Sequence, residues 1–349
     1  MKIRLTYDLR GDWPVGEHDP KDKNAEFDKP ETIDSIQGAL ESGGHQVKRI
    51  GNARNLLEQI RDLDVDIIFN ICEGYDGRCR ESQVPILLDM HRIPYVGSDG
   101  LTLGVTLDKG LAKKIFIAEG LPTPKFFLAT NSDNLDKQNT IGFPVIVKTT
   151  YEGTSKGLTE NSLVRDNAGL KRQIDFITKT YDQPALVEQF IRGTEFTIAV
   201  MGNEKCEAMP VVQISMFGSV ELGDNFYTFE MVCSDNLRYA CPAKISPEMT
   251  KTLQDLAVRA YKAVGCRDFG RVDFRVDEEG NPYILEINPL PCLDKKDIFD
   301  LFPRVQGTTY EATVNKILDF ALARCGLSGR KGAEKGKPSS GQVSLSSKS

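Results

Sequence analysis

The strongest structural pattern in the chain is RVDFRVDEEGNPYILEIN, residues 271–288. Apolar and polar side chains alternate along both of its arms, which is the two-residue period of a β-strand. The pair Glu279-Gly280 predicts a two-residue turn between the arms, because glycine adopts the positive φ that tight hairpin turns require. The sequence therefore predicts an antiparallel hairpin with one apolar face, to which Leu285 and Ile287 belong, and one polar face.

The polar face of this hairpin carries four side chains that suit metal and phosphoryl chemistry. A turn at that position places Asp273 opposite Glu286 and Arg271 opposite Asn288, with opposed Cβ atoms about 5 Å apart. Two carboxylates this close repel each other unless a cation lies between them. Asp, Glu and Asn supply oxygen ligands that Mg²⁺ accepts, and the arginine can neutralise negative charge that develops in a reaction. We therefore expect a metal site here; the plain alternative is a hairpin whose polar face meets solvent.

Two segments upstream have features of a phosphate-binding site. The apolar stretch FPVIVK (143–148) ends in Lys148 and leads to EGTSKG (152–157). A strand that enters a loop with two glycines and two hydroxyl side chains can form a nest of backbone N–H groups around a phosphate. The loop is not a Walker A motif, and a loop of this composition is usually a simple turn. Its position directly after a strand that ends in a lysine favours phosphate binding. A third segment, ALVEQFIRGTEFT (185–197), predicts two strands joined by a turn.

The first hundred residues alternate between strand-like and helix-like segments. We expect strands at 2–7, 46–50, 66–71 and 95–98, and helices at 30–42, 53–63 and 81–91. Such alternation predicts a parallel sheet with helices on its faces. No GxGxxG motif follows any of these strands, which argues against a dinucleotide-binding domain.

The pattern changes after residue 108. A helix is expected at 109–119, and strands predominate beyond it. They are expected at 125–129, 144–148, 185–189, 195–201, 208–214, 270–276 and 283–287, with helices at 163–181, 247–264 and 310–324. Runs of strands with fewer helices are typical of antiparallel α+β architecture.

Composition and charge exclude several classes of protein. The chain has 349 residues, 27% of them charged, and a formal net charge of −6, which excludes the strongly basic signature of a general nucleic-acid binder. It contains no apolar run long enough to span a bilayer and no signal-peptide pattern at its start. The eight cysteines form no CxxC pair, so free thiols in a reducing cytoplasm are the simplest account. Residues 326–349 hold five basic and one acidic side chain and are rich in Gly and Ser, which predicts a disordered basic tail.

Together these segments resemble the ATP-grasp superfamily and, within it, the D-alanine–D-alanine ligase family. The matching pieces occur in order over most of residues 1–325, at 93–98, 107–109, 144–148, 152–157, 187–188, 193–196, 270–273 and 285–288. The resemblance implies an α/β and α+β protein, in which an N-terminal parallel α/β (pre-ATP-grasp) domain precedes a two-part ATP-grasp fold. The expected units are 1–108, the central subdomain 109–194, the C-terminal subdomain 195–325 with the metal hairpin, and the tail 326–349.

The resemblance also implies roles for individual residues. Arg271 would stabilise a tetrahedral intermediate, Thr154 would supply a hydroxyl from the mobile loop, and Glu31 or Glu26 would hold the substrate ammonium. Asp273, Glu286 and Asn288 would bind two Mg²⁺ ions, which Mn²⁺ could replace. The implied contacts with ATP are Lys109 and Lys148 at the phosphates, Glu152, Gly153, Ser155 and Gly157 in the loop that covers them, Glu188, Phe190 and Ile191 at adenine, and Glu195 at ribose.

The amino-acid half of the chain departs from the family pattern at several points. Glu73 stands where a histidine usually follows the third strand, and Cys292 stands where a glycine follows Asn-x-x-Pro. Beyond the strand expected around residues 227–230, the usual Lys-Tyr pair reads Val232-Cys233.

A further departure concerns the site of the second amino acid. Asp297-Ile298 replaces the Ser-Leu pair that would hold the carboxylate of a second D-alanine. An aspartate there repels a carboxylate unless Lys295 or Lys296 compensates. The change favours a second substrate that is cationic or has no carboxylate.

The resemblance implies a cytoplasmic, ATP-dependent carboxylate–amine ligase that forms ADP and acts through an acylphosphate. D-alanyl-D-alanine, for peptidoglycan and cell wall biogenesis, is the leading product. One alternative is a ligase that joins other amino acids or a specialised metabolite, and another is a non-catalytic ATP-binding regulatory protein. The expected partners are small-molecule substrates, with no nucleic acid and no membrane, and the family implies a homodimer.

Overall fold

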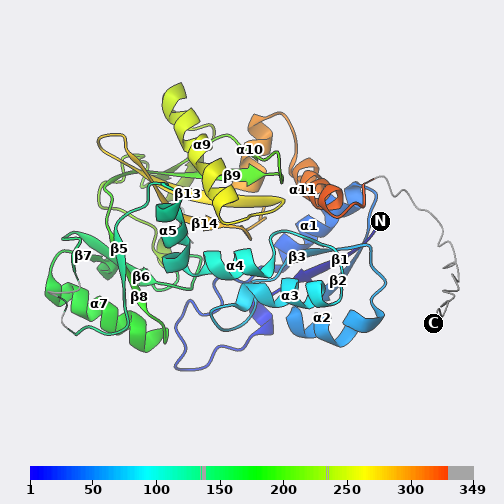
Figure 1. Ribbon diagram of the computed structural model, residues 1–349, viewed down its shortest axis with the longest axis horizontal. Helices are drawn as coiled ribbons and strands as arrows, with labels where there is room; N and C mark the ends of the chain where they lie inside the picture. The colour runs from blue at the N-terminus through cyan, green and yellow to red at the C-terminus, as the bar shows by residue number, and fades with distance from the viewer. Residues whose placement is uncertain (134, 136–138, 233, 235, 329–349) are drawn as a thin grey trace, which may run out of the picture.

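The computed structural model describes residues 1–133, 135, 139–232, 234 and 236–328. Its strands form three sheets that lie around the middle of the molecule, with helices on their outer faces (Figure 1). Among the described residues, no helix is both long enough and apolar enough to cross a membrane.

The N-terminal sheet is parallel, as the alternation of strands and helices predicts. Its order is β2-β1-β3-β4, and the strands are β1 (Lys2–Tyr7), β2 (Gln46–Gly51), β3 (Ile67–Ile71) and β4 (Tyr95–Val96). Around it lie α1 (Pro30–Ser42), α2 (Ala53–Gln59), α3 (Gln83–Met90) and α4 (Gly100–Leu107). Every residue of β3 is buried, which is typical of a parallel strand covered on both faces. The sequence interpretation missed α4, whose glycines and threonines have low helix propensity. The helix begins where the Asp99 side chain accepts a hydrogen bond from the N–H of Thr102.

The second sheet is antiparallel, in the order β5-β8-β6-β7, and α7 (Asn167–Thr180) covers it (Figure 1). Its strands are β5 (Phe126–Ala129), β6 (Val145–Thr149), β7 (Leu163–Val164) and β8 (Ala185–Gln189). The helix expected from residue 163 begins later, because residues 163–164 pair with β6 and Asp166 then caps the helix through the N–H of Gly169.

The third sheet is antiparallel and has the order β12-β11-β9-β13-β14. The short strand β10 pairs with the C-terminal end of β9. Its strands are β9 (Gly193–Met201), β10 (Glu207–Ala208), β11 (Val212–Met216), β12 (Leu237–Ala240), β13 (Phe269–Asp277) and β14 (Pro282–Asn288). The helices α5 (Lys109–Ala118) and α9 (Pro247–Ala263) pack against its apolar face.

Two strand predictions in this region are wrong. The single strand expected at 208–214 is divided into β10 and β11, because Pro210 has no N–H to donate to a ladder. The strand expected around 227–230 is a loop that leads into the short helix α8 (Phe229–Val232).

The hairpin of β13 and β14 has the predicted pairing, but its turn is longer than the predicted two-residue turn. Its loop is three residues long, since the N–H of Asp277 bonds to the carbonyl of Asn281 at 3.0 Å and Gly280 adopts a φ of +87°. A bulge at Leu285 then restores the register, so Asp273 lies opposite Glu286 and Arg271 opposite Asn288. The bulge also turns Leu285 away from the core and into the cavity described below, which corrects the predicted facing.

The C-terminal helices return to the N-terminal sheet. Residues of α10 (Ile298–Val305) and α11 (Tyr310–Arg324) share one apolar core with β1, β3 and α1, and α11 lies beside α1 in Figure 1. Leu327 is only 7% exposed and belongs to this core, although the predicted tail begins at residue 326. The rest of that predicted tail, 329–349, lies outside the described residues.

Candidate active site

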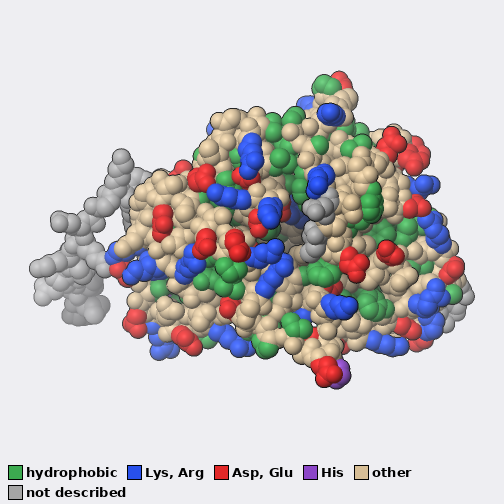
Figure 2. Space-filling view, turned by 180° about the vertical axis from the view of Figure 1, so that it is seen from behind, with side chains coloured by type: hydrophobic (Ala, Val, Ile, Leu, Met, Phe, Trp, Pro, Cys, Tyr) green, Lys and Arg blue, Asp and Glu red, His purple; other side chains and the backbone are tan. Residues whose placement is uncertain are grey.

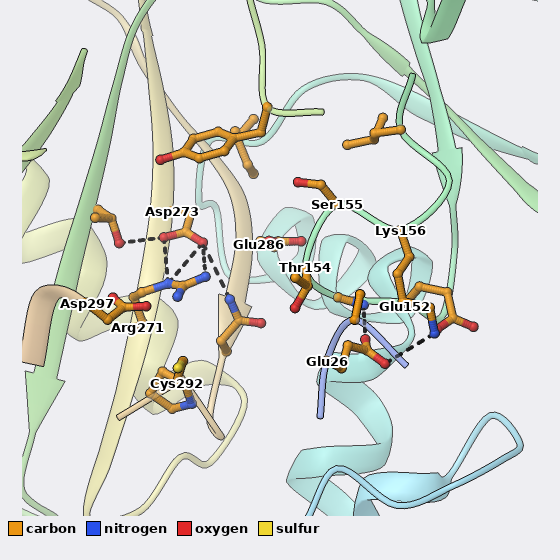
Figure 3. Close-up of a pocket in the computed structure, with 18 of the residues that line it drawn as sticks. Glu26, Glu152, Thr154, Ser155, Lys156, Arg271, Asp273, Glu286, Cys292 and Asp297 are labelled. Atoms are coloured by element: carbon orange, nitrogen blue, oxygen red, sulfur yellow. Dashed lines mark hydrogen bonds and ion pairs between the residues drawn. The ribbon is translucent and has the colours of Figure 1, made fainter. Parts of the chain in front are cut away.

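The three sheets enclose a cavity of about 390 Å³. The face drawn in Figure 2 is hollowed near its middle, and acidic and basic side chains gather around the hollow. The cavity is lined from one side by β13, β14 and residues 289–294, 297 and 298, and from the other by the loop 152–156 and residues 25–29. Figure 3 shows these two groups of side chains facing each other. The structure therefore brings the predicted hairpin and the predicted phosphate loop to one place.

The hairpin side of the cavity is organised around Asp273. Its carboxylate accepts hydrogen bonds from Arg271, at 3.0 Å from Nε and 2.9 Å from Nη2, and another from the hydroxyl of Thr197 (Figure 3). The amide of Asn288 lies 3.4 Å from the same carboxylate. The backbone alternation of β13 places Arg271 and Asp273 on one face, so the guanidinium reaches the carboxylate two residues along the strand.

Glu286 lies across from Asp273 and is held by lysines. Its Oε2 is 3.1 Å from Nζ of Lys109. Burial alone would raise the pKa of Glu286, but Lys109, Lys148 and Arg271 together bring it down to about 2. The Glu286 carboxylate is therefore charged at every physiological pH.

A buried lysine–glutamate–lysine group lies at the back of the cavity. Glu188 is 1% exposed, and its two carboxylate oxygens lie 2.8 Å from Lys113 Nζ and 2.7 Å from Lys148 Nζ. Burial would raise the pKa of Glu188, and the two lysines outweigh that effect and lower it. Burial lowers the pKa of Lys113 to about 8. The sequence interpretation missed Lys113; its signal is the four-residue spacing from Lys109, which places both side chains on one face of α5.

The phosphate-type loop has an unusual backbone. Thr154 and Ser155 both adopt positive φ, +47° and +55°, a conformation that is uncommon for residues other than glycine. Glu152 and Lys156 form an ion pair at the base of the loop, and Lys109 Nζ donates to the Glu152 carbonyl at 2.6 Å. Residues 152–156 all line the cavity.

Gly157 ends this loop outside the cavity lining. Its φ is +78°, and its N–H donates to Asp22 at 2.8 Å. In the structure this hydrogen bond fixes the loop to the segment before α1, and the expected place of Gly157 in the loop over ATP stays a prediction.

The structure does not bring Glu31 to the cavity with the other expected catalytic residues. Glu31 is exposed on the first turn of α1 and is absent from the cavity lining, because the helix already turns away at that point. Glu26 lies in the cavity instead, in the irregular segment before the helix. Its carboxylate contacts Arg80 at 2.8 Å and Lys156 at 3.4 Å, and it accepts a hydrogen bond from the N–H of Gly153 (Figure 3).

The predicted adenine and ribose residues line the same cavity. Phe190 and Ile191 are buried, and the guanidinium of Arg275 lies over the Phe190 ring, 4.7 Å from its centroid. Glu195 is 3.7 Å from Arg275. Burial raises the pKa of Glu195 to about 7, and Arg275 opposes that rise.

The far end of the cavity is acidic. Asp297 caps α10 through the N–H of Ile298, and burial raises the pKa of Asp297 although Arg271 opposes the rise. Lys295 does not compensate for it, because its Nζ pairs with Glu311 at 2.8 Å, and neither Lys295 nor Lys296 lines the cavity. Cys292 lies beside Asp297 in Figure 3. Of the Val232-Cys233 pair, Cys233 lies outside the described residues.

The side chains at the hairpin fit a hard divalent cation. Asp273 and Glu286 lie opposite each other, Asn288 is next to them, and all three can offer oxygen atoms. Within the described part of the chain no group of three or more His, Cys, Asp and Glu could hold a metal, so a cation here depends on the asparagine, on water and on substrate oxygens. That donor set is the one that Mg²⁺ accepts in phosphate-binding sites.

Comparisons with known proteins agree with this geometry. A family model for the D-ala D-ala ligase C-terminus matches residues 115–319. The uncharacterized protein y4sG of Sinorhizobium fredii is 33% identical over 299 residues, which cover 83% of this chain and 87% of the relative. The D-alanine–D-alanine ligase of Pelotomaculum thermopropionicum is 32% identical over 305 residues, which cover 85% of this chain and 92% of the relative.

A solved structure has the same fold. The D-alanine–D-alanine ligase from Bacillus anthracis, crystallised with ATP, matches with a TM-score of 0.71 at 22% identity, over 94% of this chain and 100% of that chain. The fold is therefore that of the ATP-grasp class. By its sequence the chain belongs to the D-alanine–D-alanine ligase family, and it is an ATP-dependent carbon–nitrogen ligase. The predicted family, fold class and enzyme class are confirmed.

Proposed function

We propose that this protein joins the carboxylate of one amino acid to the amine of another at the described cavity, and that D-alanyl-D-alanine is the leading product. The single observation that supports it most is the opposition of Asp273 and Glu286 in one hairpin, with Arg271 and Lys109 bound to them. A protein that only bound a nucleotide would have no need for an arginine beside the metal-type carboxylates. This argues against the non-catalytic alternative.

ATP would lie between the second and third sheets. We propose that Lys109 and Lys148 contact its phosphates and that the loop 152–157 covers them, with adenine against Phe190 and Ile191 and ribose at Glu195. Asp273, Glu286 and Asn288 would hold two Mg²⁺ ions, which neutralise the phosphates and orient the γ-phosphoryl group. The lysines are already charged and desolvated, so they need little reorganisation to receive an anion.

The reaction would take two steps. The carboxylate oxygen of the first substrate attacks the γ-phosphorus of ATP, the bond to the β-γ bridging oxygen breaks, and ADP leaves. The amine of the second substrate then attacks the acylphosphate carbon, loses a proton, and inorganic phosphate leaves as the amide forms. We propose that Arg271, which lines the cavity, stabilises the oxyanion of the tetrahedral intermediate, and that the Thr154 hydroxyl positions the first substrate from the loop.

One feature of the cavity supports the alternative in which the second substrate differs from D-alanine. Asp297 lines the cavity, and no lysine pairs with it among the described residues. A second amine that is cationic or lacks a carboxylate would suit this end better than D-alanine.

The family also suggests where the enzyme acts, what it binds and how it assembles. We propose that it acts in the cytoplasm, where ATP and free amino acids are available, on small molecules and as a homodimer. With D-alanine as both substrates, its product would feed peptidoglycan assembly.

The test is a product assay. The protein is incubated with ATP, Mg²⁺ and separate pools of D- and L-amino acids, ADP release is measured, and products are identified by mass. Formation of a dipeptide from D-alanine alone would support the leading product, whereas a mixed product would support the alternative ligase. Amino-acid-independent ATP binding with no ADP release from any pool would contradict the ligase proposal.

A further inference from the structure

Two carboxylates in the cavity have no role in the proposed chemistry. Glu73 follows β3, and Glu81 lies in the short turn of 3-10 helix before α3. Both line the cavity on the side of Glu26 and the segment 25–29. Neither is among the residues that the family resemblance assigns to ATP or metal.

Glu81 is buried without a partner. Glu81 is only 9% exposed and lines the cavity. Among the described residues no hydrogen bond or ion pair reaches its carboxylate. The same holds for the Glu73 carboxylate, which is partly buried. Buried carboxylates are normally paired, so two of them facing one cavity indicate that a ligand supplies the missing charge.

The cations nearby are already engaged by other carboxylates. Arg80 Nη2 lies 2.8 Å from Glu26 and 3.3 Å from Glu152, and its Nη1 donates to the Tyr151 carbonyl. Lys156 pairs with the same two glutamates. These contacts also occupy Glu26. Of the cavity-lining carboxylates on this side, Glu73, Glu81 and Asp28 then have no ion pair within the described residues.

The electrostatics agree with this geometry. Burial and then the neighbouring Glu81 raise the pKa of Glu73 well above its usual range. Burial raises the pKa of Glu81 to about 7 in spite of Arg80. A positive group between the two carboxylates would restore their charge and relieve their repulsion.

We propose that Glu73 and Glu81 form an ammonium-binding subsite, which receives the primary ammonium group of an amino-acid substrate in place of Glu26. The substrate class is thus a carboxylate that also carries a free amine, rather than a hydroxy acid or an acylated amino acid. The inference rests on the proposed ligase function, because it assigns the amine of that reaction's substrate to a place in the cavity.

The test compares amine-bearing and amine-free substrates in Glu81→Gln and Glu73→Gln. The probes are the amino acid that gives the highest ADP release in the wild type and its α-hydroxy analogue, for example D-alanine and D-lactate. We expect either variant to raise the KM for the amino acid about 10- to 100-fold and to reduce its advantage over the hydroxy acid by a similar factor. The KM for ATP should change by much less, within about threefold, since Lys109 and Lys148 pair with Glu286 and Glu188 rather than with either carboxylate of the subsite.

Two further variants separate recognition from folding. Glu81→Asp keeps the negative charge and should retain most of the preference for the amine, whereas a structural role would not distinguish Asp from Gln in this way. Glu58→Gln, at an exposed glutamate of α2, serves as the matched control, and the thermal midpoint of each variant reports its folding.

The outcomes distinguish the two proposals. A wild type that releases ADP with amino acids, together with Glu81→Gln and Glu73→Gln variants of unchanged KM and unchanged preference, overturns the subsite and leaves the ligase function standing. A wild type that releases no ADP with any amino acid overturns the ligase function and the subsite with it.

Discussion

The two ends of the cavity differ in how their charges are balanced. At the paired end, every carboxylate has a cation beside it: Glu188 with Lys113 and Lys148, Glu286 with Lys109, Asp273 with Arg271, and Glu195 with Arg275. At the open-acid end, no ion pair reaches any of these five cavity-lining carboxylates within the described residues: Asp28, Glu73, Glu81, Asp294 and Asp297. Burial raises the pKa of Asp28 to about 7, and the nearby Asp294 adds to the rise.

The difference indicates which end depends on its ligand. The paired end is electrically complete without substrate, so ATP and metal would exchange one set of ion pairs for another. The carboxylates of the open-acid end have no direct ion pair within the described residues, so a cationic group of a substrate would supply one. This is consistent with an enzyme that keeps the nucleotide chemistry of its family, and it supports the alternative in which the second substrate is cationic or has no carboxylate.

The largest effect is expected at Asp273, because its carboxylate is proposed to bind metal and is fixed by Arg271. Asp273→Asn should lower kcat by about 10³-fold or more while the fold is retained. Steady-state ADP release measures the loss, and circular dichroism checks the fold. Asp319→Asn, at an exposed position of α11, is the control. Turnover within tenfold of the wild type would rule out the metal assignment.

Substitution of Lys113 tests how much the ion pairs of Glu188 with Lys113 and Lys148 contribute to stability. Lys113→Met leaves buried Glu188 with one lysine, and removal of one partner from a buried ion pair costs about 3–5 kcal/mol of unfolding free energy. The adjacent Lys114→Met is a matched control, since Lys114 is exposed. Urea unfolding measures both, and equal stabilities for the two variants would show that Lys148 alone suffices for Glu188.

Glu286 predicts a pH dependence of stability. Its folded pKa, about 2, lies below the ordinary value of 4.5, so its contribution is present above pH 4.5 and is lost as pH falls toward 2. The contribution is at most about 3 kcal/mol. Urea unfolding at pH 3, 5 and 7 should therefore show a smaller loss on acidification in Glu286→Gln than in the wild type. Parallel pH curves for the two proteins would mean that the lysines do not stabilise this carboxylate.

Thr154 gives the smallest expected change in stability. Glycine tolerates its φ of +47°, so Thr154→Gly should raise the unfolding free energy by up to about 1 kcal/mol. The loss of the hydroxyl should at the same time lower kcat/KM for the amino acid more than for ATP. Thr159→Gly, which removes a cap at a residue with ordinary extended φ, should destabilise instead. A less stable Thr154→Gly protein would show that the loop is not strained.

Much of the site could be predicted because it depends on short-range sequence patterns. The pairing of Asp273 with Glu286 follows from strand alternation, and it was correct because a longer turn and the bulge at Leu285 offset each other. Lys113 and Glu81 could not be assigned in this way, since their roles depend on contacts between segments distant in sequence. The sequence did not show which of Glu26 and Glu31 faces the cavity, because that depends on where α1 begins and how it lies in the fold. The division of the chain at residues 108, 194 and 325 stays a prediction.

The shared core of α11 and the N-terminal sheet has a consequence for how the protein is made. The strands β1 and β3 cannot complete their apolar core until residues 298–322, which follow them far along the sequence, have been synthesised. We therefore expect residues 1–71 to leave part of this apolar surface exposed during synthesis, until the C-terminal helices have formed. A nascent chain stalled at residue 296 should be readily cleaved by protease in residues 1–71, and protection there would show that the first sheet can complete itself without its last helix.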